Sequence, residues 1–189
     1  MIEYIIKVII LSVFVVLTYI LAPLLALISM PFKDLPWFLI WFGQYDDDMD
    51  GTNDPGWRKE HILLPDTAWR KWWNRTRWIW RNPCQYFDKW ILGIPVWDNY
   101  KIEVDGNRLI GVDIFEEPKD IPIFKPGWIK KTVINYNGRK LFFYRKVFKW
   151  PWINRCCDIK LGYAIWDSVK PREKAKLVFT PFSFSKMGG

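Results

Sequence analysis

The feature that most constrains this chain is an uncharged apolar run from Val8 to Met30. As a helix it covers about 34 Å, enough to cross the hydrocarbon core of a bilayer. A cleaved signal peptide and a buried core helix are the alternatives. The run is longer than the apolar region of a signal peptide, and Pro23 blocks cleavage after Ala22. We therefore expect one membrane-spanning helix, in which Pro23 removes a backbone donor.

The charges next to the run do not orient it, because Lys7 precedes it and Lys33 follows it. Basic residues then accumulate on its C-terminal side, between residues 58 and 81, which favours a cytoplasmic location for that side. Cysteine is scarce, and the adjacent Cys156 and Cys157 make poor disulfide partners, as is typical of a reducing compartment. We expect a single-pass protein of the inner membrane with its soluble domain in the cytoplasm.

Beyond the run, the segment 35–42 is too short to cross a bilayer. It either lies in the membrane interface through Trp37 and Trp41 or begins the soluble core. We expect residues 1–44 to form the anchor with this possible interfacial helix, and residues 45–189 to form one basic, Trp-rich soluble domain. Half of the residues are hydrophobic, 14 are Trp and the net charge is +8, which excludes a disordered chain and favours anionic partners.

An acidic segment follows, in which Asp46, Asp48 and Asp50 alternate ahead of Gly51. The spacing resembles the first half of a calcium loop, because alternate carboxylates in a tight turn can converge on one hard cation. These three aspartates are therefore candidate Ca²⁺ ligands. However, Trp57 stands where an EF-hand has its bidentate glutamate, and a solvated turn explains the same residues. No other cofactor is expected.

The clearest amphipathic helix is expected from Thr67 to Arg81, with Asp66 as its N-cap and Asn82-Pro83 as its stop. One arc gathers Trp69, Trp72, Trp73, Thr76, Ile79 and Trp80. The other side carries Arg70, Lys71, Asn74, Arg75, Arg77 and Arg81, with Trp78 among them.

The sequence supports two main interpretations of this helix. In the first, its aromatic arc packs on a sheet and its charges are solvated. In the second, it lies in the membrane interface and contacts lipid or other anions through Trp69, Arg70, Trp73, Arg75, Arg77, Trp80 and Arg81. Stacking of a single-stranded nucleic acid is a third possibility, but the chain has no RNA-binding motif, so nucleic acid is the least favoured partner.

From Tyr100 onward, short apolar runs broken by turn residues predict strands. Residues 101–104 and 108–115 form one expected hairpin, and residues 128–136 and 139–148 form another around Asn137-Gly138. Further strands are expected at 156–166 and 176–184. The predicted class is α+β: one transmembrane helix, then a mainly antiparallel β domain, either a small sandwich or a partly open barrel, with one amphipathic Trp/Arg helix.

Catalytic constellations are missing from the sequence. His61 is the sole histidine and has no nucleophile elbow, P-loop or zinc signature beside it. Cys84 lies in an aromatic stretch where a buried, inert thiol is the default. We expect no enzymatic activity.

Several motifs occur in a fixed order: Trp41-Phe42, Asp46, Met49-Asp50-Gly51, Trp78-Ile79-Trp80-Arg81-Asn82-Pro83, Tyr86-Phe87-Asp88 and Leu92-Gly93. This order resembles a family of uncharacterised small membrane-associated proteins of tailed bacteriophages. Residues 160–163 and 178–182 extend the resemblance. It implies a phage origin and brings no catalytic residues.

Together these features lead us to expect a membrane-anchored phage protein. It would act as a binding module for a host or phage protein at the surface of the host inner membrane, with the lipid bilayer as its other partner. One alternative is a virion or DNA-ejection component that inserts into the host envelope. Another is a lysis-related membrane protein, which the long soluble domain disfavours.

Overall fold

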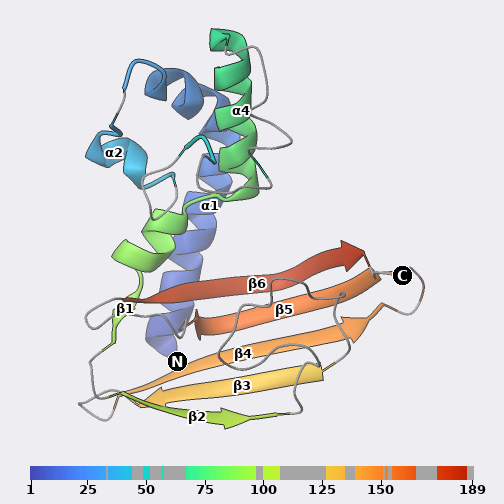
Figure 1. The fold of residues 1–189 in the computed structure, drawn as a ribbon. Helices are drawn as coiled ribbons and strands as arrows, with labels where there is room; N and C mark the ends of the chain where they lie inside the picture. The colour runs from blue at the N-terminus through green and yellow to red at the C-terminus, as the bar shows by residue number, and fades with distance from the viewer. Residues whose placement is uncertain are drawn as a thin grey trace. The chain divides into compact units, whose positions relative to one another are not determined.

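The computed structural model describes residues 1–32, 34–43, 49–51, 57, 67–96, 100–106, 127–134, 139–150, 152, 155–164 and 174–186. They belong to two compact units, Met1–Leu92 and Gly93–Gly189, which we call the helical unit and the sheet unit (Figure 1). The predicted α+β class is confirmed: a long apolar helix at the N-terminus is followed by helices and a six-stranded antiparallel sheet.

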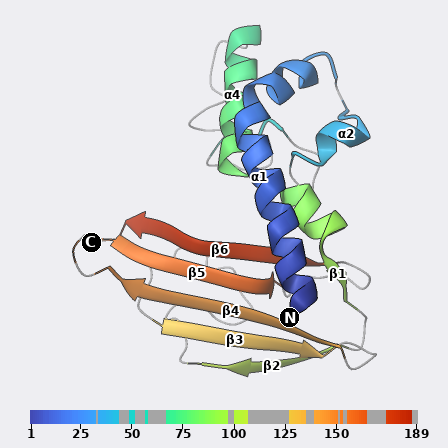
Figure 2. The same ribbon diagram turned by 180° about the vertical axis from the view of Figure 1, so that it is seen from behind.

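The helical unit is built on α1 (Ile2–Ser29), which continues as one helix through Pro23. The other helical elements are α2 (Trp37–Ile40), α4 (Ala68–Arg81) and a short π-helical turn, η2 (Phe87–Ile91). Helix α4 packs along the C-terminal half of α1, as the two opposite views in Figures 1 and 2 agree. The anchor helix is therefore part of this unit, and the two compact units divide after Leu92.

The contact between α1 and α4 uses a stripe of small residues. Thr18, Ala22, Ala26 and Ser29 are fully buried and recur every three or four residues, so they share one side of α1. Small side chains allow a second helix to approach closely. In the core of the unit, Ala22, Leu25 and Ala26 of α1 pack with Leu39 of α2 and Ile79 of α4. Met49 belongs to the same core.

The sheet unit contains β1 (Ile94–Pro95), β2 (Lys101–Asp105), β3 (Gly127–Ile134), β4 (Lys140–Lys149), β5 (Arg155–Ala164) and β6 (Lys174–Lys186). Neighbouring strands are antiparallel in the order β1-β6-β5-β4-β3-β2. The described strands thus form a single sheet with β1 and β2 at its edges, not two packed sheets. The predicted β3–β4 hairpin is confirmed, while its Asn137-Gly138 turn and the expected strand 108–115 lie outside the described residues.

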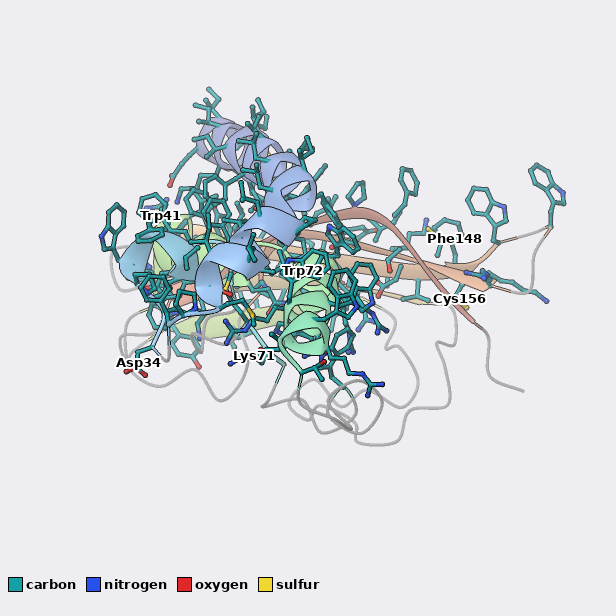
Figure 3. All side chains as sticks on the ribbon, turned by 90° about the horizontal axis from the view of Figure 1, so that it is seen from above. Asp34, Trp41, Lys71, Trp72, Phe148 and Cys156 are labelled. Carbon is teal, nitrogen blue, oxygen red and sulfur yellow. The ribbon has the colours of Figure 1, made fainter. Side chains whose placement is uncertain are left out.

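The alternation of side chains gives each strand two faces. Cys156 and Cys157 pair with Lys149 and Phe148 of β4, so the two cysteines point to opposite faces and cannot bridge each other. Figure 3 shows Phe148 and Cys156 on opposite sides of the sheet. Gly162 has φ +103°, and a Cβ there would lie 2.1 Å from the Phe142 carbonyl oxygen, so the close β4–β5 contact requires glycine.

Candidate membrane interface

The surface of α1 is apolar on most of its circumference and stays exposed after the helical unit has folded. In its most apolar stretch of 18 residues, 22% of the residues are buried. Its exposed large apolar side chains are Ile2, Ile5, Ile6, Ile9, Ile10, Val13, Val16, Leu17, Tyr19, Ile20, Leu24, Leu27 and Ile28. Soluble monomers rarely leave a continuous apolar surface of this size in water. The helix is long and apolar enough to span a membrane.

Two indoles of α4 donate hydrogen bonds to backbone carbonyls of α1 around Pro23. Trp80 Nε1 donates to the Tyr19 carbonyl at 2.9 Å, and Trp72 Nε1 donates to the Pro23 carbonyl at 2.7 Å. In a regular helix, the residue at position 23 donates its N–H to the carbonyl of Tyr19, but proline has no N–H. The Trp80 indole therefore supplies the donor that Pro23 lacks.

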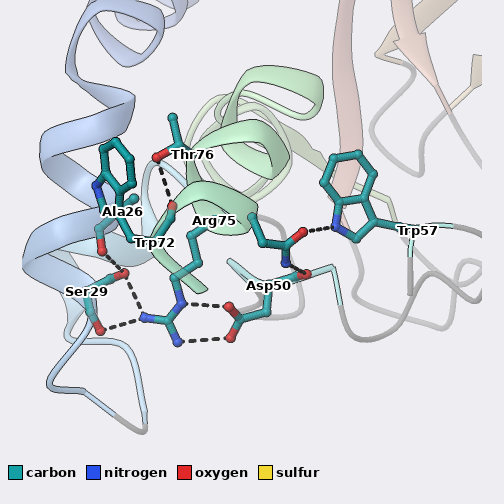
Figure 4. Close-up of polar contacts among 8 residues, drawn as sticks. Ala26, Ser29, Asp50, Trp57, Trp72, Arg75 and Thr76 are labelled. Atoms are coloured by element: carbon teal, nitrogen blue, oxygen red, sulfur yellow. Dashed lines mark hydrogen bonds and ion pairs between the residues drawn. The ribbon is translucent and has the colours of Figure 1, made fainter. Parts of the chain in front are cut away.

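Arg75 fastens the C-terminal end of α1 to the rest of the unit (Figure 4). Its Nη1 donates to the Ser29 carbonyl and to Ser29 Oγ, both at 2.7 Å. Its Nε and Nη2 hold the Asp50 carboxylate at 2.7 and 2.9 Å in a bidentate ion pair. A cation at this position also complements the partial negative charge at the end of α1. One guanidinium thus joins α1, the Met49–Gly51 turn and α4.

A second buried side of α4 faces Trp57. Asn74 accepts a hydrogen bond from Trp57 Nε1 at 3.0 Å and donates to the Asp50 carbonyl at 2.9 Å. Trp78 is buried with its ring centre 5.0 Å from that of Trp57. The Arg81 guanidinium lies 5.3 Å from the Trp57 ring centre and 5.5 Å from that of Trp78. Helix α4 is therefore buried on two sides, one against α1 and one against Trp57.

This packing corrects two expectations about α4. Arg75, expected among the solvated or lipid-facing cations, is buried because Asp50 and Ser29 converge on it. Trp78 lies among the cations as expected, with the Arg81 guanidinium 5.5 Å from its ring centre, and it is also buried. The N-cap is also one residue later than expected: Thr67 Oγ1 accepts from the Arg70 N–H at 3.3 Å, and Asp66 lies outside the described residues.

The remaining predicted contact residues stay at or near the surface. Trp69 is 69% exposed, Trp73 is 41% exposed, and Arg70 and Arg81 are exposed. Trp80 and Arg77 are half-buried, with the Arg77 guanidinium 5.5 Å from the Trp57 ring centre. On α2, Leu39 is fully buried while Trp37 is 69% exposed, so this segment enters the core and also presents an aromatic surface. Exposed tryptophans and arginines around an apolar helix are typical of a membrane–water boundary.

Residues 1–187 match a family of unknown function (DUF7338). The chain belongs to this family. No curated protein and no solved structure matches the chain. The DUF7338 match takes in both units, from α1 through the sheet. In this member of DUF7338, the apolar helix is therefore part of the family sequence and not an unrelated addition.

The middle of α1 is covered by aromatic rings from two other segments of this DUF7338 chain. Phe14 stacks on Phe42 with ring centres 4.8 Å apart and on Phe87 with ring centres 4.1 Å apart. Beside them, Cys84 shares a hydrogen bond of 2.8 Å with the Thr18 hydroxyl. Burial raises the pKa of the Cys84 thiol to about 12, so it is protonated near neutral pH and unsuited to nucleophilic chemistry.

Of the three candidate calcium ligands, Asp50 belongs to the residues that the structure describes. Asp46 and Asp48, like His61, lie outside the described residues. Both carboxylate oxygens of Asp50 are bonded to Arg75. Within the described ranges, no group of three or more His, Cys, Asp or Glu side chains could hold a metal ion. A metal role for the acidic segment stays a prediction.

Proposed function

We propose that this member of DUF7338 is a single-pass protein of the bacterial inner membrane. In this proposal, α1 crosses the bilayer and the sheet unit binds a host or phage protein at the cytoplasmic surface. The infected-cell setting comes from the resemblance to tailed-phage proteins. The observation that carries the proposal is the exposed apolar surface of α1, on a helix that is also built into the fold.

This combination disfavours the two alternatives for α1. The core helix of a soluble protein is mostly buried, whereas 22% of the most apolar stretch of α1 is buried. A cleaved signal peptide would take Ala22, Leu25 and Ala26 out of the core of the helical unit. It would also remove the carbonyls to which Trp80 and Trp72 donate. A retained, lipid-facing helix satisfies all of these contacts.

The orientation is supported by charge and by cysteine chemistry. Basic side chains follow α1 at Arg70, Lys71, Arg77 and Arg81, whereas Lys7 is the basic side chain near its start. The positive-inside rule then favours a cytoplasmic C-terminal part. All three cysteines are thiols in the structure, which suits a reducing compartment.

A charge-insertion experiment tests the anchor. Val13→Arg/Val16→Arg places two cations on exposed positions of α1, where they cost little in water but about 2.5–3.5 kcal/mol each at the centre of a bilayer. Val104→Arg, on an exposed position of β2, is the matched control. We expect the native chain and the control to resist alkaline extraction from membranes and the double variant to be extracted. Extraction of the native chain, or retention of the double variant, would contradict the anchor.

Topology and partner binding need a second experiment. A green fluorescent protein fused to the C-terminus should fluoresce, and a fused alkaline phosphatase should be inactive, if the sheet unit is cytoplasmic. The same tagged chain, cross-linked in infected cells and purified from membranes, should retain one defined protein. Recovery of virion proteins alone would replace the binding-module proposal with the virion or DNA-ejection alternative.

A further inference from the structure

The sheet unit carries an aromatic cluster where β4 turns into β5. We call it the hairpin patch: Phe148, Trp150, Trp152 and Phe182. Trp152 is 84% exposed and Phe182 is 65% exposed. Trp150 N–H donates to the Arg155 carbonyl at 2.9 Å, which closes the hairpin, and its ring centre lies 6.2 Å from that of Phe148. Trp152 is thus exposed between two strands that this hydrogen bond joins.

The strand register places Phe148 on the same face of the sheet as Phe179, which is 40% exposed. Phe179 pairs with Leu161, and Leu161 pairs with Tyr144, so these three side chains share a face. Phe148 is four residues beyond Tyr144 on β4 and therefore shares it too. Phe182 lies where the β5–β6 register shifts, and such bulges redirect side chains. Figure 3 shows Phe148 on the side of the sheet opposite to Cys156.

Cations border the patch. Lys146 and Arg155 are exposed and, by strand alternation, share the face that carries Phe148; Lys146 Nζ lies 5.8 Å from the Phe148 ring centre. The acidic side chain nearby in sequence, Asp158, is buried and neutralised by Arg145 at 2.9 Å and by Lys160 at 3.2 Å. The exposed surface around the rings is therefore positively charged and complements an anionic surface.

We propose that the hairpin patch inserts into the head-group region of an anionic bilayer and forms a second membrane contact in addition to α1. Tryptophan and phenylalanine rings partition to the membrane interface, where lysine and arginine pair with lipid phosphates. This inference rests on the proposed anchor, because a tether to the bilayer raises the effective concentration of lipid at the patch. The tether favours lipid over a soluble acidic protein as the occupant.

Spin labelling of the full chain in vesicles tests this contact. Cysteines replace Trp152 or Phe182 in the patch, Val13 on α1, and Val104 on β2 as an aqueous reference; the natural cysteines are buried. The vesicles contain phosphatidylcholine alone or equal parts of phosphatidylcholine and phosphatidylglycerol. Collision rates with oxygen and with a water-soluble nickel complex then report whether each label lies in lipid or in water. Two cations near the surface predict a shift toward lipid contact on the order of 30-fold in the anionic vesicles.

The outcomes separate this inference from the anchor. We expect the 152 and 182 labels to become oxygen-exposed and nickel-protected in anionic vesicles, and to lose this in Lys146→Glu/Arg155→Glu but not in Lys101→Glu/Lys140→Glu. Water exposure of both patch labels in both lipids, with the Val13 label in hydrocarbon, would overturn the patch and leave the anchor standing. Water exposure of the Val13 label would reject the anchor. In that case, oxygen exposure of the 152 and 182 labels would still support the lipid contact, and their nickel exposure would overturn it.

Discussion

The hydrogen bond from Trp80 to the Tyr19 carbonyl allows a stability prediction that two substitutions can isolate. Trp80→Phe keeps an aromatic ring but removes the indole donor at 2.9 Å. Because Pro23 has no N–H, the Tyr19 carbonyl then loses the donor that α4 provides. Pro23→Ala restores a backbone N–H four residues after Tyr19, so it gives the carbonyl a partner within α1.

The expected loss of stability depends on whether the Tyr19 carbonyl has a hydrogen-bond donor. An orphaned carbonyl away from water costs about 1–3 kcal/mol. If α1 spans the bilayer as proposed, lipid offers no replacement donor. Trp80→Phe should therefore destabilise the helical unit by that amount plus a packing loss for the smaller ring. In the Pro23→Ala background the packing loss alone should remain. The coupling energy between the two substitutions should be about 1–3 kcal/mol.

Alkylation of Cys84 provides the assay, since this thiol is buried beside Thr18 and becomes reactive when the helical unit opens. Unfolding of the bilayer-reconstituted chain by dodecyl sulfate would be followed by brief alkylation and mass spectrometry of the Cys84 peptide. Trp69→Phe, at a 69% exposed position, is the control and should have little effect in either background. An equal cost of Trp80→Phe with proline or alanine at position 23 would refute the hydrogen-bond reasoning.

Two further predictions concern buried polar groups of the helical unit. Arg75→Met removes the guanidinium that pairs with the Asp50 carboxylate and should destabilise the unit by about 3–5 kcal/mol in the alkylation assay, whereas Arg75→Met/Asp50→Asn should cost less; equal costs would contradict the pairing. The pKa of Cys84, raised mainly by burial from 9.0 to about 12, keeps the folded thiol protonated while the unfolded thiol ionises. The free energy of unfolding should therefore fall by up to about 1.4 kcal/mol per pH unit above 9.0 and level off near 12, and this fall should appear in the difference between the curves of the native chain and Cys84→Ala. Near-uv circular dichroism at several pH values measures it; identical pH dependence of the two chains would contradict the buried thiol.

Local periodicity predicted much of the fold. The uncharged run 8–30 lies within α1, and the alternation of apolar residues predicted β3 to β6 to within a few residues. Helix α4 ends at Arg81, before Asn82-Pro83, as its stop signal indicates. These features depend on neighbours in the sequence, because a helix cap, a proline stop or a strand alternation acts within a few residues.

The sites where prediction differed from structure involve distant residues. Arg75 looked like one more solvated cation, since Asp50 and Ser29 are 25 and 46 residues away in the sequence. No periodic pattern predicted that Trp78 and Trp57 are buried against each other, because Trp57 stands alone beside an acidic segment. Met49-Asp50-Gly51 ahead of a basic helix was the one available hint of an ion pair across the turn.

The sequence by itself determined that this chain has an apolar helix able to span a membrane, an amphipathic Trp/Arg helix and an antiparallel sheet, because composition and period dictate each element locally. Only the tertiary structure decided that α1 belongs to the helical unit, that α4 is buried on two sides, and which rings remain exposed at the hairpin patch. The physical reason is that a side chain is buried, paired or exposed according to the surfaces brought against it, and those surfaces come from segments far apart in the chain.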